Sequence, residues 1–334
     1  MLALVLVVAL ALVFDLTNGF HDSANAVAAL VATRAARPPA ALLLASACTI
    51  AGPLLVGTAV ADTVGSVVAL PAGEVVPAVG AAVTAAIAWN LLTWRRGLPS
   101  SSSHAVVGGL VGACAATAGL SAVRWGGWED GHVNGLLGVL TGLALSPLLG
   151  VLVGSAVVVG ARRSLRRATR RVTAAVRHGE YGTAAALAFS HGANDAQKTM
   201  GIITLLLLSA GHLHAFTVPL WVKLAAAAAM TLGTALGGWR IVRTVGRGIY
   251  RLTPLDGLVS QAGSAAVILG AAGVGAPVST THVVAASVVG VGVGQRKRHV
   301  RWRVVREMAS AWLVTLPATA LLAGVVVPLW QATT

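Results

Sequence analysis

The chain has 334 residues, of which 56% are hydrophobic and only 10% are charged, and its mean hydropathy is +0.82. A soluble globular domain carries roughly a quarter charged residues, so this composition excludes that class. The net charge of +14 does not indicate a nucleic-acid partner, because the arginines are gathered in short blocks between hydrophobic segments. Such blocks are typical of the cytoplasmic loops of a multi-pass membrane protein.

The N-terminal run is predicted to be a membrane segment rather than a cleaved leader. It has no charged residue in its first 14 positions and leads into Asp15 instead of a small-residue cleavage site. The two cysteines, Cys48 and Cys114, both lie in apolar windows, and inert buried thiols are expected there.

Ten segments follow one another along the chain, each near the length of roughly 20 apolar residues that crosses a bilayer. The predicted crossings are residues 1–33, 39–61, 75–94, 100–123, 133–160, 183–211, 215–238, 256–273, 277–294 and 307–330. Basic loops are expected to stay in the cytoplasm. The loops so placed carry Arg34, Arg37, Arg95, Arg96 and the blocks 162–177, 240–251 and 296–306. Both termini, and the loops with Asp62, Glu74, Glu129 and Asp130, are then expected outside a cell membrane.

The chain contains an internal repeat. Residues 18–28 (NGFHDSANAVA) resemble residues 191–201 (HGANDAQKTMG), which aligns Asp22 with Asp195. Residues 100–112 (SSSSHAVVGGLVG) resemble residues 278–290 (VSTTHVVAASVVG), which aligns His104 with His282. Two halves of five segments each must run in opposite directions, and such inverted repeats are typical of secondary transporters.

The predicted fold is therefore an all-α polytopic membrane protein with an inverted-topology repeat of two five-segment halves. Interrupted or re-entrant helices are expected, with about 10–12 membrane segments in all. The first repeat is assigned to residues 1–160, an Arg-rich cytoplasmic linker to residues 161–180, and the second repeat to residues 181–334.

The aspartates of the first motif pair point to a cation. Asp22 and Asp195 are expected at membrane depth, where an unpaired carboxylate costs at least about 2.5–3.5 kcal/mol. Carboxylate, amide and backbone oxygens are hard ligands that suit a small cation. Gly19 and Gly192 are expected to let the two helices unwind nearby and expose such carbonyls. The alternative is that these polar groups only join helices by hydrogen bonds, and the duplication of the motif favours the cation site.

The serine and threonine runs point to an anion. Residues 100–103 and 279–281 stand just before apolar runs, where helix N-caps occur. Helix N-termini offer free N–H groups and a positive dipole end, so two of them can hold a tetrahedral oxyanion from two sides. Ordinary capping without a ligand is the alternative. His104 and His282 are expected either to tune protonation or to fix a loop.

These paired motifs look like those of the inorganic phosphate transporter (PiT) family of secondary transporters, and the resemblance covers nearly the whole chain. It implies an inverted-repeat helical fold that carries phosphate with a coupling cation. By position, it implies that the cation and phosphate are served by Asp22, Asn25, Asn194 and Asp195, which are also the ligands if a metal is bound. It implies that phosphate is contacted by Ser101, Ser102, Ser103, Ser279, Thr280 and Thr281.

Two positions depart from the family pattern, which often has Asn before the Asp and again three residues after it. Here His21 precedes Asp22, and Lys198 stands where Asn25 has its counterpart. The Lys198 ammonium is predicted to occupy the place of an alkali cation or to carry a proton, and histidines change charge near neutral pH. Segment 39–61 also lacks the Glu that sodium-coupled members often carry. We therefore add His21 and Lys198 to the coupling residues, the alternative being that Lys198 is an ordinary ion-pair partner.

The predicted function is uptake of inorganic phosphate, alone or as a neutral metal-phosphate complex, by proton symport with alternating access. This pattern resembles the low-affinity bacterial branch of the family. A sodium-coupled phosphate symporter and a sulfate permease on the same scaffold are the alternatives. No enzyme is expected, because a hydrolase using Ser103 and His104 would need two adjacent helical residues to meet. Phosphate, membrane lipid and a second copy of the chain are the expected partners. No cofactor is expected, and a divalent metal is expected only as part of the substrate.

Overall fold

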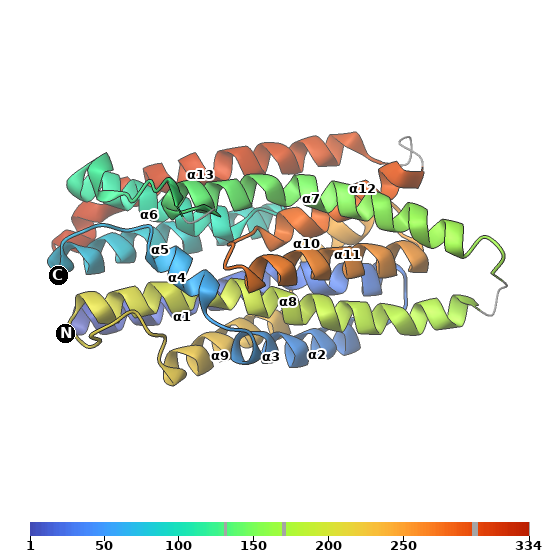
Figure 1. Cartoon of the computed structure of the whole chain (residues 1–334), viewed down its shortest axis with the longest axis horizontal. Coiled ribbons are helices and arrows are strands. Elements are labelled where there is room, and N and C mark those ends of the chain that lie inside the picture. The colour runs from blue at the N-terminus through green and yellow to red at the C-terminus, as the bar shows by residue number, and fades with distance from the viewer. Residues whose placement is uncertain (130–131, 169–171, 296–299, 334) are drawn as a thin grey trace.

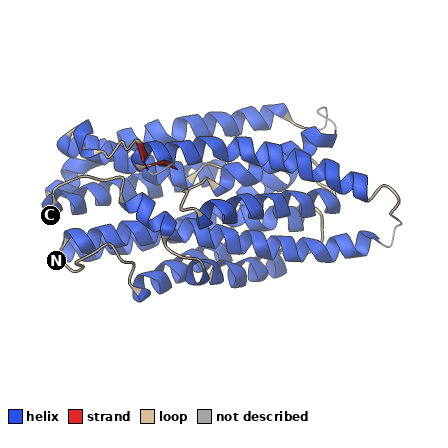
Figure 2. Cartoon of the chain, in the orientation of Figure 1, coloured by secondary structure: helices blue, strands red, loops and turns tan. Residues whose placement is uncertain are grey.

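The computed structural model describes residues 1–129, 132–168, 172–295 and 300–333, and nearly all of them lie in helices (Figure 1, Figure 2). The first half of the chain contains the helices α1 (Leu2–Ala32), α2 (Pro38–Thr49), α3 (Ala51–Leu55), α4 (Ala59–Gly65), α5 (Ala72–Arg96), α6 (Ser102–Ala118) and α7 (Gly135–Ser164). The second half contains α8 (Val172–Ser209), α9 (Leu220–Leu236), α10 (Trp239–Arg243), α11 (Pro254–Gly273), α12 (Thr280–Gln295) and α13 (Trp302–Gln331).

The remaining regular elements are short. A 3₁₀ turn covers Leu120–Ala122, and a π-helical turn, η2, covers Thr244–Gly248. Two strands of two residues each, β1 (Trp128–Glu129) and β2 (His132–Val133), pair antiparallel, with Trp128 opposite Val133. The fold is thus an all-α bundle, as predicted.

Each of the ten predicted crossings coincides with a helix or with a broken run of helices. Among the described residues, six helices are long and apolar enough to cross a membrane: α1, the Pro38–Leu55 run, α5, α7, α11 and α13. The bent pair of α9 and residues 239–248, with a 60° angle between its parts, brings the number to seven. The chain is therefore a multi-pass membrane protein.

Two of the predicted crossings are helices that begin inside the bundle. α6 has 17 residues and α12 has 16, and the first residues of both are buried. α6 packs mainly on α13 and α5, whereas α12 packs mainly on α7 and α11. Each short helix is therefore covered by a long helix of the other predicted half, which interlocks the two halves around the middle of the bundle.

The two ends of the bundle differ in what they carry. Both termini lie at one end, and the connection between α7 and α8 lies at the other (Figure 1). The predicted linker 161–180 is divided between the last turn of α7, the connection, and the first turns of α8. Several residues that the sequence places in loops lie outside the described residues: Asp130, Arg170, Arg171, Arg296 and Arg298.

The cysteines match the prediction in one case only. Cys114 is buried, but Cys48 is partly exposed on α2, because this helix covers the outside of α8 and α9.

Candidate functional site

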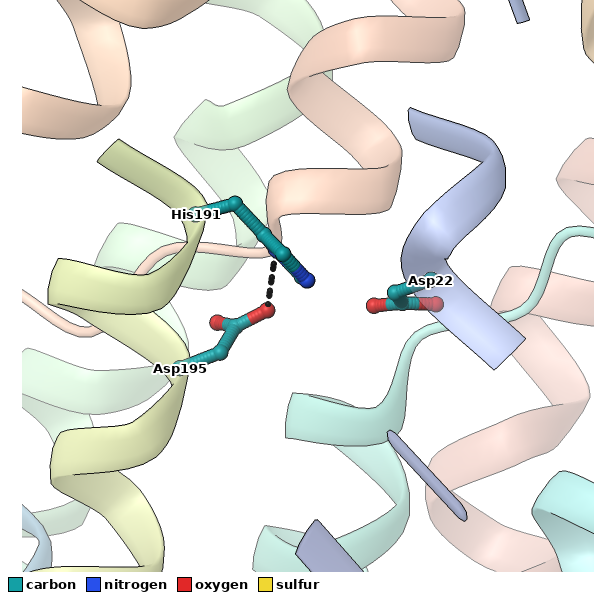
Figure 3. A group of neighbouring side chains, drawn as sticks. All are labelled: Asp22, His191 and Asp195. Carbon is teal, nitrogen blue, oxygen red and sulfur yellow. Dashed lines mark ion pairs between the residues drawn. The ribbon is translucent and has the colours of Figure 1, made fainter. Parts of the chain in front are cut away.

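The two signature aspartates meet in the middle of the bundle, on α1 and α8. One ligand-capable atom each of Asp22, His191 and Asp195 lies within 4.8 Å of the others. Figure 3 shows these three side chains between the two helices. All twelve site residues predicted from the sequence are at most 2% exposed. The site is therefore buried in the interior of the bundle.

The glycines of the motifs do not unwind their helices, so that prediction was wrong. α1 and α8 are continuous helices through both motifs. A Cβ atom at Gly19 would lie 2.1 Å from the Met230 carbonyl oxygen, and one at Gly192 would lie 2.2 Å from the Thr49 carbonyl oxygen. The glycines are needed for the close approach of neighbouring backbones, as in other membrane helix pairs.

Asp195 is held by groups from two helices. Lys198, one turn along α8, donates to Oδ1 of Asp195, and the Thr280 hydroxyl of α12 donates to Oδ2 at 2.7 Å. Nδ1 of His191 lies 3.0 Å from the same Oδ2. A buried carboxylate with a fixed ammonium and a hydroxyl donor is compensated in its charged form.

Asp22 has a different set of neighbours. Its Oδ1 lies 2.5 Å from Nδ1 of the adjacent His21, and its Oδ2 receives only a long contact of 3.4 Å from the Ser102 hydroxyl. Nε2 of His21 lies 3.3 Å from the Thr93 hydroxyl and 3.4 Å from the Ser100 hydroxyl. The partner of Asp22 is thus a group whose charge depends on its own protonation.

The predicted helix caps are present, and two of the predicted phosphate contacts serve them. The Ser101 hydroxyl accepts a hydrogen bond from the His104 backbone N–H at 3.1 Å, and the Ser279 hydroxyl accepts one from the His282 N–H at 3.2 Å. The His104 ring also contacts the Ser101 oxygen, at 2.8 Å.

The other four predicted phosphate contacts face the motif helices. Ser102 and Thr280 contact the two aspartates, as described above. Ser103 receives a hydrogen bond from the Lys198 ammonium at 2.5 Å, and Thr281 receives one from the Asn25 amide at 3.0 Å. These last two contacts join the two predicted halves of the chain across the site.

Two amide oxygens in the site have no hydrogen-bond partner among the described residues. They are Oδ1 of Asn25 and Oδ1 of Asn194. The Asn194 side chain donates weakly, at 3.5 Å, to the Ala276 carbonyl oxygen. Together with the Asp22 carboxylate, these oxygens are hard ligands of the kind that bind a small cation. The residues therefore fit the predicted cation role.

Several groups at the site were not assigned a role from the sequence. His191 is the first residue of the second motif and aligns with Asn18 of the first. The two residues differ in type, so the alignment marks the position of His191 but gives it no role. Thr93 and Ser100 reach His21 from α5 and from the turn after it, which no local pattern indicates. Asp15 lies two turns before Asp22 on α1, is fully buried, and has no hydrogen bond to either oxygen.

The chain is similar to known proteins over nearly its whole length. Residues 18–323 match the model of the phosphate transporter family. A "Probable low-affinity inorganic phosphate transporter" of Bacillus subtilis (strain 168) is 39% identical over 327 residues, covering 96% of this chain and 95% of that protein. The protein of the same name from Mycobacterium tuberculosis (strain ATCC 25618 / H37Rv) is 43% identical over 321 residues, covering 95% of this chain and 75% of that protein.

One solved structure has the same fold. It is titled "The sodium-dependent phosphate transporter", superimposes with a TM-score of 0.88 over the full length of both chains, and is 22% identical in sequence. At this identity the likeness concerns the fold alone. The match of residues 18–323 and the identity to curated relatives show that the chain belongs to the phosphate transporter family, a family of transporters rather than hydrolases.

Proposed function

We propose that the chain takes up inorganic phosphate by proton symport, with alternating access to a central site. One observation carries the proposal: two short helices, α6 and α12, begin beside the buried aspartate pair and present four hydroxyls to the motif helices, two of them to the aspartates. Helix N-termini and hydroxyl donors suit an oxyanion. Two helix N-termini, one from each predicted half, can hold a tetrahedral oxyanion from two sides. The Lys198 ammonium, in contact with Ser103, adds the positive charge that such an anion needs.

Phosphate fits this site better than sulfate does. Near neutral pH phosphate keeps an ionisable proton, whereas sulfate is fully ionised, so only phosphate can donate a hydrogen bond to a carboxylate. Oδ2 of Asp22 has just one long contact and is therefore the oxygen with room to accept such a bond. In this proposal Ser102, Ser103, Thr280 and Thr281 contact phosphate directly, while Ser101 and Ser279 hold the two helix starts in place.

Coupling to protons is supported by the cationic neighbours of the aspartates. The Lys198 ammonium already neutralises Asp195, which leaves less need for an alkali cation there. His21 adjoins Asp22 at 2.5 Å, so a gain or loss of its proton changes the charge beside the phosphate position. The coupling residues are then His21, Asp22, Asn25, Asn194, Asp195 and Lys198.

The inverted repeat and its orientation also belong to this proposal. Each predicted half has a long motif helix, a later short helix that starts at the site, and a long final helix, which is the pattern that inverted repeats produce. The end with the α7–α8 connection carries basic residues that contact one another's backbones, as Arg240 does with Arg95 and Arg301 with Arg247. By the positive-inside rule that end faces the cytoplasm.

A metal-phosphate substrate is favoured by a further observation. Asp22, His191 and Asp195 offer three ligand atoms within 4.8 Å of one another, next to the position proposed for the oxyanion. Two carboxylates and an imidazole suit a divalent cation that travels as part of the substrate. Simultaneous uptake of labelled metal and labelled phosphate in a fixed ratio is expected, and phosphate uptake that ignores added metal would eliminate this form of the substrate.

The decisive experiment is radiolabelled phosphate uptake into proteoliposomes under an imposed proton or sodium gradient, with sulfate as competitor. We expect uptake that follows the proton gradient and resists sulfate, and that falls in Ser103→Ala but not in the exposed control Ser121→Ala. Uptake that needs sodium and ignores the proton gradient would contradict the coupling. Sulfate uptake without competition by phosphate would contradict the substrate.

A further inference from the structure

A row of polar residues runs along one face of α1. Asp15, Asn18, Asp22 and Asn25 follow one another at intervals of three and four residues, which places them on a single side of a helix. Asp22 and Asn25 belong to the central site, and Asp15 lies two turns, or about 10 Å, nearer the N-terminus. The residue seven places before Asp195 on α8 is Ala188, so the repeat does not duplicate the Asp15 carboxyl.

Asp15 differs from the other buried carboxyls of the described residues. The other four buried carboxyls each have at least one hydrogen-bond or ion-pair partner; they are Asp22, Glu180, Asp195 and Asp256. Asp15 is 0% exposed, and neither of its oxygens has a partner. It is therefore the one buried carboxyl in the described part of the chain with no hydrogen bond of normal geometry and no ion pair.

The surroundings of Asp15 come from α8, which packs against α1. The Thr199 hydroxyl is a weak hydrogen-bonding neighbour of Asp15, although neither group has a hydrogen bond of normal geometry. Two charged groups also act on Asp15: Lys198 attracts a negative charge there, and Asp195 repels it. The Lys198 ammonium is already bound to Asp195 and Ser103, so it does not pair with Asp15.

An ionised carboxylate without a partner is too costly to persist at membrane depth, so Asp15 either holds a proton or is accompanied by a cation. The central aspartates have such charges built into the chain, in Lys198 and in the protonated form of His21. Asp15 has no such charge built into the chain, so the proton or cation that neutralises it comes from solution. A single carboxylate suits one monovalent cation. Two further oxygens without a hydrogen-bond partner are available near it: that of Asn18, one turn along α1, and that of Thr199 on the packed helix α8.

We propose that Asp15 is the site of an exchangeable monovalent cation, a proton or an alkali ion, that enters from the N-terminal end of α1 and couples to phosphate at the central site. This inference rests on the proposed cation-coupled uptake and assigns that coupling to a residue outside the signature motifs. It explains why the carboxyl occurs only once in the repeat: a cation that loads from one side of the membrane needs an outer site at one end only.

The test compares Asp15→Asn with the exposed control Asp62→Asn in proteoliposomes. Two rates are measured: exchange of labelled phosphate with equal ions on both sides, and uphill uptake under a proton or a sodium gradient. We expect Asp15→Asn to lose uphill uptake by about tenfold or more while exchange stays within about twofold. Asp15→Glu is expected to keep both, and the gradient that drives the wild type identifies the cation.

A second readout does not depend on transport. A cation that binds the folded chain raises its melting temperature. The wild type is expected to gain stability with added sodium or with falling pH, and Asp15→Asn is expected to lose that gain while it folds normally. Uphill uptake by Asp15→Asn at the wild-type rate would overturn the site and leave the proposed function intact. Loss of exchange in the folded variant would also overturn it. Absence of ion-driven uptake in the wild type would instead contradict the proposed function.

Discussion

The two motif helices, α1 and α8, carry the same aspartate in different surroundings. On α8, Asp195 is bound to a lysine and to a threonine hydroxyl 2.7 Å away. On α1, Asp22 adjoins a histidine at 2.5 Å and receives a hydroxyl at 3.4 Å. A lysine supplies a permanent charge, whereas a histidine supplies one only when protonated.

This difference separates two tasks within one site. On the α8 side the Lys198 ammonium compensates the Asp195 carboxylate and places a positive charge next to Ser103. The α1 side has the carboxylate that is paired with a histidine, and it also has the additional carboxyl of Asp15. We infer that the α1 side responds to the driving ion and the α8 side holds the anion.

The largest expected effect is a difference in stability between the variants of the two aspartates. Asp195→Asn leaves the Lys198 ammonium buried without its counter-charge, which costs about 3–5 kcal/mol. Asp22→Asn removes a charge whose partner His21 can become neutral, so we expect a loss of about 1–2 kcal/mol. Thermal unfolding of the purified variants in detergent checks the difference. Equal losses would show that Lys198 does not compensate Asp195 in the way the contacts indicate.

The double variant Asp195→Asn/Lys198→Met sharpens the same comparison. It replaces the ion pair by two neutral side chains, so most of the stability lost in Asp195→Asn should return, by about 2–3 kcal/mol. Transport should stay low, because the positive charge beside Ser103 is gone. Lys223→Met on α9, a partly exposed lysine, is the matched control and should change neither quantity. A double variant no more stable than Asp195→Asn would argue against the pair.

The α1 side should determine how transport depends on pH. His21→Gln keeps a hydrogen-bonding side chain beside Asp22 but never carries a charge. We expect the change in uptake between about pH 5 and 8 to become several-fold smaller, since histidine protonation is then removed. Initial uptake rates across that range provide the measurement, with the exposed His178→Gln as control. A pH profile that keeps its wild-type shape would remove His21 from the coupling.

A smaller effect is expected where the two sides touch. Thr281→Val removes the hydroxyl that accepts from Asn25 at 3.0 Å and should cost about 1 kcal/mol. If this hydroxyl also contacts phosphate, the KM for uptake rises about fivefold at unchanged kcat. Thr141→Val on the exposed face of α7 is the control. A variant with normal KM would limit Thr281 to a structural contact.

The smallest effect lies where the end of α1 meets the start of α8. Glu180 precedes the predicted crossing 183–211 and accepts a hydrogen bond from Thr33 at 2.9 Å. Burial raises the pKa of Glu180 from its ordinary 4.5 to about 7, and the Thr33 hydrogen bond and Arg177 only partly oppose this shift. The folded state therefore holds its proton more tightly than the unfolded chain, and stability falls as the pH rises from about 4.5 to about 7.

Glu180→Gln should be free of this loss. Its melting temperature is expected to match the wild type near pH 4.5 and to exceed it by about 2–4 °C at pH 8, a shift that about 1 kcal/mol produces in large domains. Melting curves at the two pH values are the measurement. An equal difference at both would mean that the Glu180 proton is not the cause.

Much of this protein is determined by its sequence alone. Hydropathy is a local property, so the ten segments and the membrane class follow from composition along the chain. The motif pairs are also local, and they identified Asp22, Asp195 and the two helix starts before any contact was known. The serines Ser101 and Ser279 cap their helices as their positions predict, because a cap binds its own next turn.

Only the tertiary structure decided what each polar group is used for. Gly19 and Gly192 pack against backbones from other helices, which no motif records. The surroundings of Asp15 come from Thr199, Lys198 and Asp195 of α8, and Lys198 reaches Ser103 from 95 residues away. Compensation of a buried charge depends on atoms within a few ångströms, and in this bundle those atoms come from helices far apart in the chain.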